Sequence, residues 1–178
     1  MSLPKVGGTV LWLLPGRDGD ELFTDIIQKL AVLFDGPIFM PHITIGRIPD
    51  WEPGKIIHAV DVISENICRF SMPVKTVHCK NHPYQKISVE TEPVPGFEAM
   101  LEQINHQFGG EYGKREYPHL SLLYSTLPCS RLQDKVVRIR SKIPAQIHLH
   151  ELAYISVSGT PDQWHVIHSR SLKKVSQV

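Results

Sequence analysis

Two histidines occur in the same short pattern, one in each half of the chain. His42 lies in Pro-His-Ile-Thr-Ile, where Thr44 follows it by two positions. His119 lies in Pro-His-Leu-Ser-Leu, where Ser121 takes the corresponding place. Residues two apart in an extended strand share one face and lie about 6–7 Å apart along the backbone. Each copy therefore presents a histidine beside a hydroxyl, and the two copies predict two halves of one site.

Two imidazoles and two hydroxyls are suited to opening a phosphodiester. With a pKa of about 6.5, histidine has both its neutral and its protonated form accessible near neutrality, so one ring can take a proton from the attacking oxygen while the other protonates the leaving oxygen. Each positioned proton transfer contributes a factor of roughly 10²–10⁴ to the rate. The hydroxyls can hold the non-bridging phosphate oxygens by hydrogen bonds. Because the chain has no carboxylate cluster of the kind that holds Mg²⁺, we expect no metal and no cofactor.

The composition is that of an ordinary globular protein. The 178 residues are 42% hydrophobic and 21% charged, with a formal net charge of +1. This charge balance argues against binding to long nucleic acid or to an anionic membrane. No run approaches the roughly 18 apolar residues of a membrane span, and the first residues lack the apolar region of a signal peptide. We therefore expect a cytoplasmic monomer acting on a small molecule, with association to an organelle surface left open.

The three cysteines, Cys68, Cys79 and Cys129, are few and odd in number, and none is in Cys-x-x-Cys spacing. They are expected to be reduced thiols.

The spacing of apolar residues predicts strands and helices along the whole chain. The expected helices cover about 19–34, 54–68, 97–108 and 130–142. The expected strands cover about 8–14, 42–48, 72–80, 84–91, 119–126, 147–157 and 163–169. A bulge is expected near Glu151, where the alternation changes phase, and the tail 171–178 is expected to be frayed.

The order of these elements repeats. Residues from about 8 to 80 follow the order strand, helix, motif strand, helix, strand, and residues from about 84 to 157 follow it again. One motif in the middle of each half predicts a single domain, 1–178, made of two similar lobes related by a pseudo-twofold axis. The site is expected in the cleft between them.

The paired motifs resemble those of the two-histidine phosphoesterase superfamily, whose signature is His-x-Thr/Ser-x repeated once per lobe. The likeness is greatest to its cyclic phosphodiesterase branch from fungi and plants. Further landmarks are Tyr117 before the second motif, Leu122-Leu123-Tyr124 behind it, Trp12-x-Leu-Pro15 near the start and Trp164 near the end.

The resemblance implies an α+β fold with two antiparallel sheets, helices outside and a water-filled central cleft. It also implies cofactor-free opening of 2′,3′-cyclic nucleotides to 2′-phosphates, and of ADP-ribose 1″,2″-cyclic phosphate to the 1″-phosphate, in RNA metabolism such as tRNA splicing. His42 and His119 would be the acid–base pair. We favour His119 as the base, although the reverse order stays open.

The resemblance further implies that Thr44 and Ser121 hold the phosphate and that Tyr124 contacts the phosphate or the base. By simple alternation Tyr124 lies on the opposite strand face from Ser121, so it reaches the cleft only if the strand bends or ends. No disulfide is carried over from the plant members.

Two other functions are compatible with the motifs. One is an RNA-end enzyme of the same superfamily, either similar to a 2′–5′ RNA ligase or a 3′ exonuclease. The other is a nucleotide- or RNA-binding module that holds phosphate without turnover.

For some tryptophans, histidines and basic residues outside the motifs, both a structural and a functional interpretation are possible. Trp12 is either a core residue or a border of the cleft, and Trp164 is either a stacking surface for a base or a packing residue. The segment from His78 to His82 resembles a metal site but lacks a fourth ligand. His148 and His150, which share a strand face, are expected to face solvent without a hydroxyl partner, and the basic run 131–142 is expected to be the solvent side of a helix.

Overall fold

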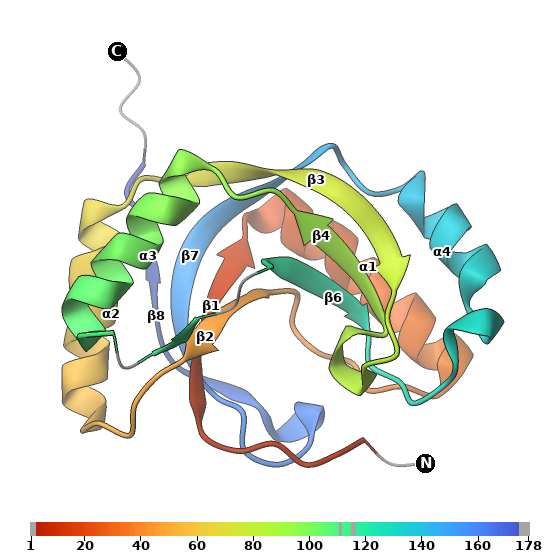
Figure 1. Ribbon diagram of the computed structural model, residues 1–178, viewed down its shortest axis with the longest axis horizontal. Helices are drawn as coiled ribbons and strands as arrows, with labels where there is room; N and C mark the ends of the chain where they lie inside the picture. The colour runs from red at the N-terminus through yellow and green to blue at the C-terminus, as the bar shows by residue number, and fades with distance from the viewer. Residues whose placement is uncertain (1–2, 111, 115–116, 175–178) are drawn as a thin grey trace.

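The computed structural model describes residues 3–110, 112–114 and 117–174. Within these residues, four helices and eight strands alternate along the chain (Figure 1). The helices are α1 (Arg17–Phe34), α2 (Pro53–Asn66), α3 (Pro95–Phe108) and α4 (Gln133–Arg140). The strands are β1 (Thr9–Pro15), β2 (Ile43–Arg47), β3 (Phe70–Cys79), β4 (Ile87–Thr91), β5 (Gly113–Lys114), β6 (His119–Leu123), β7 (Gln146–Ser156) and β8 (His165–Ser171). Three short 3₁₀ turns are η1 (Pro83–Gln85), η2 (Cys129–Arg131) and η3 (Pro161–Gln163).

Each helix and strand expected from the apolar spacing is present, but the expected strand 119–126 ends at Leu123 and the expected helix 130–142 begins at Gln133, after η2. Three further differences concern other segments. The first residues of the expected strand 84–91 form the turn η1 instead, because Pro83 starts a 3₁₀ turn there. The two-residue strand β5 was not expected. The tail is not frayed from residue 171, since Ser171 ends β8 and Leu172 is only 2% exposed. The last four residues of the expected tail lie outside the described residues. The bulge near Glu151 is confirmed by a register shift where β7 passes the end of β1.

The strands form one sheet rather than the two that were expected. Its order is β1-β2-β6-β4-β3-β7-β8, β5 pairs with β2, and β1 also pairs with β7, so six of the strands close into a ring. Every strand pair is antiparallel, which agrees with the expected α+β class. The sheets merge because β3, from the first half of the chain, pairs with β4, while β7, from the second half, pairs with β1. Each half thus contributes its last strand to the other.

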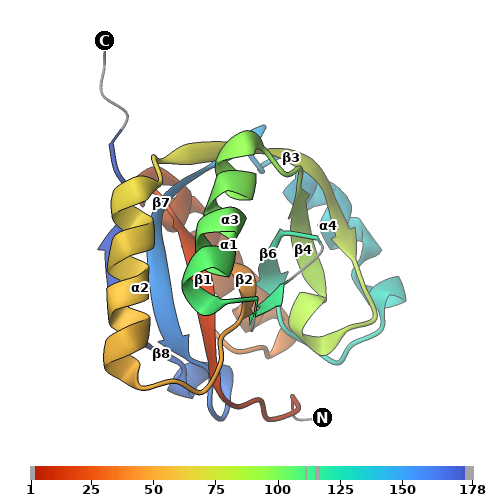
Figure 2. The ribbon, with the colours of Figure 1, turned by 60° about the vertical axis from the view of Figure 1, so that its left-hand side comes forward.

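The helices cover the outside of this ring and bury the main core. In two views α2 and α3 lie side by side on one flank, and both contact strands of the sheet (Figures 1 and 2). The helix α1 packs on β1 and β6, and α4 packs on β3. Proline stands at the start of α2 and of α3, where its missing N–H costs no hydrogen bond. On the inner face of β1 and β7 a second, smaller apolar cluster forms around Trp12 and Ile155.

The connection from α1 to β2 runs close to the end of β6. Asp35 ends α1 in a left-handed conformation, and Gly36 follows it. A Cβ on Gly36 would lie 3.0 Å from the carbonyl oxygen of Tyr124 and 3.3 Å from the side chain of Leu123. Glycine therefore allows this connection to pass directly beside the end of the second motif strand.

The interpretation of all three cysteines as reduced thiols is wrong. Cys79 at the end of β3 and Cys129 in η2 form a disulfide, whereas Cys68 is free and exposed. The fold brings the Cα atoms of the disulfide-bonded pair to 5.7 Å although 50 positions separate them in sequence. No short spacing in the sequence marked this pair. None of the helices in the described part of the chain has the length and apolar character needed to cross a membrane.

Candidate active site

The two histidine motifs meet where β2 and β6 pair. The strands are antiparallel and their register matches Ile43 with Leu120, and both of these side chains are fully buried. In an antiparallel pair the residue before one member lies opposite the residue after the other, on the same face. Each motif's histidine therefore lies across from the other motif's hydroxyl residue. The pseudo-twofold relation expected between the motifs is centred on this single residue pair.

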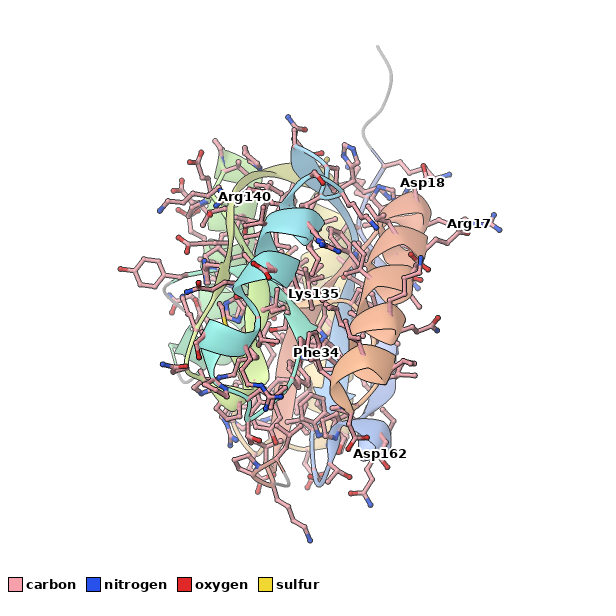
Figure 3. All side chains as sticks on the ribbon, turned by 90° about the vertical axis from the view of Figure 1, so that its right-hand side faces the viewer. Arg17, Asp18, Phe34, Lys135, Arg140 and Asp162 are labelled. Carbon is pink, nitrogen blue, oxygen red and sulfur yellow. A yellow bond between two sulfur atoms is a disulfide. The ribbon has the colours of Figure 1, made fainter. Side chains whose placement is uncertain are left out.

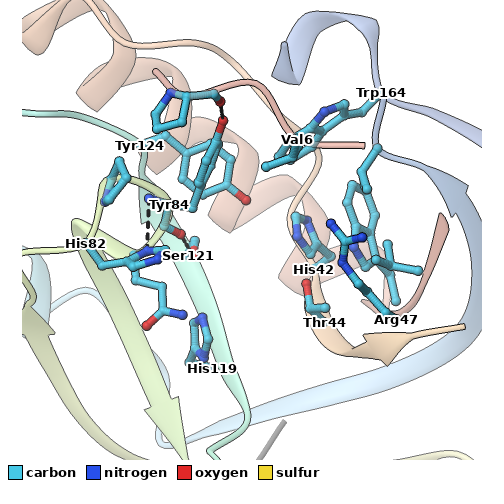
Figure 4. A pocket seen from close by; sticks show the side chains of 16 residues that line it. Val6, His42, Thr44, Arg47, His82, Tyr84, His119, Ser121, Tyr124 and Trp164 are labelled. Atoms are coloured by element: carbon cyan, nitrogen blue, oxygen red, sulfur yellow. Dashed lines mark hydrogen bonds between the residues drawn. The ribbon is translucent and has the colours of Figure 1, made fainter. Parts of the chain in front are cut away.

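All four motif residues line one pocket of about 610 Å³. His42 and Thr44 lie on one wall, and His119 and Ser121 lie on the facing wall (Figure 4). Other parts of the wall come from the N-terminal segment, β1, the turn η1, the residue after β6 and the connection between β7 and β8. The two halves of the sequence pattern thus lie in one cavity, as the pattern predicted.

Both imidazole rings are held in the same way by their own backbone. The Nδ1 atom of His42 lies 2.6 Å from the carbonyl oxygen of Met40, and Nδ1 of His119 lies 3.0 Å from the carbonyl oxygen of Tyr117. A carbonyl oxygen only accepts hydrogen bonds, so Nδ1 is the donor and carries a proton in both rings. Nε2 is then the nitrogen that can take up or release a proton in each ring.

The surroundings of the two rings differ. His42 is only 5% exposed and stacks on the indole of Trp12, with ring centroids 3.5 Å apart and planes 8° from parallel. His119 is half-buried, and the register of β4 and β6 places Glu90 opposite it. One ring is therefore packed on an aromatic face, while the other has a carboxylate residue beside it on the sheet.

The carboxylate of Glu90 is itself held by two basic groups. Lys75 Nζ lies 3.1 Å from one of its oxygens, and His78 Nδ1 lies 3.5 Å from the other. The hydrogen bond from Lys75 holds the pKa of Glu90 below its usual value, against a smaller opposing effect of burial. The pKa of His78 is lowered, mainly by burial and also by the charge of Lys80. Glu90 is thus a fixed negative charge next to the second motif.

The two hydroxyls are not equivalent. Ser121 Oγ donates a hydrogen bond to the carbonyl oxygen of Tyr84 at 2.9 Å, so in this structure its proton is directed at η1. Donation to a phosphate would require the Ser121 hydroxyl to rotate away from that carbonyl. Thr44 is half-buried and lines the pocket on the opposite wall.

Tyr124 lies in the pocket because the strand stops in front of it. The strand β6 ends at Leu123, so the alternation that would have turned Tyr124 to the other face no longer applies. Its ring is 3% exposed and stacks on Phe39, with centroids 3.7 Å apart and planes 9° from parallel. The structure therefore places Tyr124 with the motif residues.

An aromatic wall closes one side of the pocket. It consists of Trp12, Tyr84, Tyr124 and Trp164, whose neighbouring ring centroids lie between 5.2 and 6.1 Å apart. Burial raises the pKa of Tyr84, and the Tyr84 hydroxyl donates a hydrogen bond to the carbonyl oxygen of Pro4 in the N-terminal segment. Trp12 and Trp164 are thus both packed against other rings, and both line the cavity. Trp12 therefore borders the cleft, and the stacking of a base on Trp164 stays a prediction.

Comparison with known proteins gives the family. The sequence matches the family described as "Cyclic phosphodiesterase-like protein" over residues 7–172. The chain belongs to this family. A protein of Arabidopsis thaliana described as "Cyclic phosphodiesterase" is 22% identical over 117 residues, which are 66% of this chain and 65% of that protein. The match thus spans about two thirds of the length of that relative.

Solved structures of the same fold include proteins from two bacteria. Escherichia coli LigT complexed with 3′-AMP has a TM-score of 0.56 and 15% identity, covering 96% of this chain and 99% of that one. TT0787 of Thermus thermophilus has a TM-score of 0.59 and 14% identity, covering 93% and 98%. These likenesses concern the fold. Together with the family match they confirm the resemblance to the two-histidine phosphoesterase superfamily.

Several pocket residues were not assigned to this site from the sequence. Arg47, His82, Tyr84 and Gln85 line the cavity as well. Arg47 ends the first motif strand, so a basic residue this close to the motif could have been predicted to belong to the site. The other three lie in or beside the turn η1, and no periodicity marks a turn residue as part of a distant site.

The remaining histidines and the basic helix lie elsewhere. His148 is exposed, as expected, and its Nδ1 lies 2.6 Å from Ser71 Oγ on the neighbouring strand β3, a partner that the sequence did not indicate. Cys79, in the segment considered for a metal, is in the disulfide, and the described residues contain no group of three or more potential metal ligands. The helix α4 lies on the outside of the molecule beside α1, and its Arg140 donates a hydrogen bond to Thr76 (Figure 3).

Proposed function

We propose that this chain hydrolyses small cyclic phosphodiesters by metal-independent acid–base catalysis with two histidines. The observation that carries the proposal is the arrangement of the two rings. His42 and His119 lie on facing walls of one pocket, and each uses Nδ1 to bind its own backbone. This leaves an Nε2 atom on either side of a bound phosphate, which is what an in-line displacement at phosphorus requires.

In this mechanism a 2′,3′-cyclic nucleotide binds with its phosphorus between the rings. Nε2 of His119 takes a proton from water as the water oxygen bonds to phosphorus. The bond from phosphorus to the 3′-oxygen breaks, and Nε2 of His42 gives its proton to that oxygen. The product is a 2′-phosphate, and proton exchange with solvent restores both rings. The corresponding opening of ADP-ribose 1″,2″-cyclic phosphate yields the 1″-phosphate.

The surroundings of the rings support this direction over its reverse. The acid must carry its proton at the start, and the ring of His42 lies against the indole face of Trp12, a surface that can contact a cation. The base becomes a cation during the reaction, and the charge of Glu90 opposite His119 stabilises that product. Thr44 and Ser121 donate hydrogen bonds to the non-bridging oxygens once the Ser121 hydroxyl has rotated.

The aromatic wall supports a nucleoside rather than a bare phosphate as the substrate. Aromatic side chains bind nucleobases by stacking, and this contact tolerates different bases. Trp164, which is half-buried and lines the pocket together with the motif residues, offers a ring for such a contact.

The test is incubation with adenosine 2′,3′-cyclic phosphate in EDTA, with the product separated by chromatography. We expect adenosine 2′-phosphate to accumulate at an undiminished rate. Binding without product would replace the proposal with a nucleotide-binding module, and loss of turnover on chelation would reject the metal-free mechanism. Production of the 3′-phosphate would show that the other ester bond is cleaved.

A further inference from the structure

Arg47 is the only arginine or lysine among the described residues that line the pocket. It is the last residue of β2 and lies on the same wall as His42 and Thr44, away from Tyr84 (Figure 4). Two residues, Ile45 and Gly46, lie between it and Thr44, and these three strand steps correspond to about 10 Å along the backbone. The backbone of Arg47 is therefore offset along β2 from the residue that would hold the reacting phosphate.

Among the described residues, no acidic partner neutralises the charge of Arg47. The side chain is exposed, and no carboxylate in the described part of the chain lies within ion-pairing distance of it. By contrast, Arg17, Lys29 and Arg170, on outer surfaces of the fold, each pair with an acid. An unpaired guanidinium at a pocket is free to bind an anionic group of a ligand.

The backbone beside Arg47 leaves room for its side chain. Gly8 has a positive φ of 92°, and a Cβ at this position would lie 3.3 Å from Nη1 of Arg47. Two pocket residues lie beside this position: Val10 pairs with Arg47 across β1 and β2, and the Val157 N–H donates to the carbonyl oxygen of Gly8. Both side chains are aliphatic and offer no hydrogen-bond acceptor. The guanidinium thus lies against glycine backbone and beside an apolar wall, where its donors remain available.

We propose that Arg47 binds a second phosphate of the substrate, so that the preferred substrates are cyclic phosphodiesters that carry an additional phosphoryl group. The inference rests on the proposed function, because it takes the reacting phosphate to lie between the two histidines. The fork of N–H donors on a guanidinium matches two oxygens of a phosphate, which makes arginine suited to this role.

The experiment compares two substrates that differ by one phosphate. These are adenosine 2′,3′-cyclic phosphate and adenosine 5′-phosphate 2′,3′-cyclic phosphate. For the unaltered chain we expect kcat/KM to be about tenfold to a hundredfold higher for the second, as charge-assisted hydrogen bonds to a phosphate allow. Arg47→Gln should abolish this preference and leave the first substrate nearly unaffected. Arg47→Lys should retain part of it, because the charge stays while the fork is lost.

Arg138→Gln is the matched control. It removes the same charge from an exposed position on α4, whose side chains do not line the pocket. It should leave the ratio of the two kcat/KM values unchanged, which separates a direct contact from a change in net charge.

Two kinetic outcomes would overturn the inference. A preference that survives Arg47→Gln would show that another group reads the second phosphate. An equal loss for both substrates would show that Arg47 acts on the reacting phosphate.

A binding arm distinguishes failure of this inference from failure of the proposed function. The dissociation constants of adenosine 2′-phosphate and adenosine 2′,5′-bisphosphate are measured for the unaltered chain and for Arg47→Gln, without any turnover. If neither cyclic substrate is hydrolysed but Arg47→Gln still removes the tighter binding of the bisphosphate, the proposed function fails and the second-phosphate site stands. If the bisphosphate binds no more tightly than the monophosphate, the site is refuted whatever the catalytic result.

Discussion

Substituting asparagine for His119 separates the structural role of Nδ1 from the proposed catalytic role of Nε2. The amide of asparagine can occupy the place of Nδ1 and still donate to the carbonyl oxygen of Tyr117, which accepts at 3.0 Å in the native chain. Nothing replaces Nε2, so the variant keeps the local hydrogen bond and loses the proton transfer. Because His119 is half-buried and its backbone contact is retained, we expect little change in thermal stability.

The magnitude follows from the role of a general base. Loss of one positioned proton-transfer group should lower kcat by roughly 10²–10⁴-fold, or about 3–5 kcal/mol of activation free energy. KM should change by less than about threefold, since the interactions that the substrate makes in the ground state remain. The bell-shaped dependence of kcat/KM on pH should lose the limb that reports the base.

The assay is single-turnover hydrolysis of adenosine 2′,3′-cyclic phosphate in EDTA across pH 5–9, alongside thermal unfolding of each variant. His165→Asn is the control, because His165 also places Nδ1 against the carbonyl oxygen two residues before it, at 3.1 Å, but lies on β8 outside the pocket. It should leave kcat unchanged. If His119→Asn retains kcat within threefold while folded, His119 is not the base and the mechanism is refuted.

Three further variants test other features of the site and its support. Tyr124→Phe keeps the buried ring and removes only the hydroxyl, so we expect KM to rise about threefold to tenfold; an unaltered KM would exclude a hydroxyl contact with substrate. Cys129→Ser removes the disulfide to Cys79, which closes a loop with a sequence separation of 50, and should lower the free energy of unfolding in urea by about 2–4 kcal/mol. If the unaltered chain unfolds at the same urea midpoint with and without reductant, this expectation is contradicted. Glu90→Gln tests the depressed pKa of Glu90, whose ionised form Lys75 stabilises in the folded chain. The stability that Glu90 contributes is therefore present above its unfolded pKa and lost as pH falls through the lower folded pKa, so the difference between native and variant should shrink from pH 6 to pH 3; a constant difference would refute it.

The active-site pattern could be predicted from sequence because it depends on local geometry. Side chains two apart in a strand share a face whatever surrounds them, so His42 with Thr44 and His119 with Ser121 were paired correctly before their strands were placed. The same rule alone could not place Tyr124. Its position depends on β6 ending at Leu123, and the end of a strand depends on its neighbours in the sheet.

Contacts between distant segments were beyond sequence reasoning for a single chain. The disulfide joins Cys79 with Cys129, and the bond between Ser71 and His148 joins β3 with β7. Neither pair shares a motif or a spacing. Arg47 was overlooked for a related reason, since its importance comes from the absence of a neighbouring acid among the described residues, which only the folded surroundings reveal.

By itself, the sequence determined the class of the elements, the two motifs and the faces on which their side chains lie, because hydrophobic periodicity acts within one strand or helix. Only the tertiary structure decided that the expected sheets join into one, that β3 and β7 cross to the other half, and that the motifs meet at Ile43 and Leu120. Several strands have a similar local pattern, so each could pair with more than one partner. Which strands pair depends on the packing of the whole core, and no single segment contains that information.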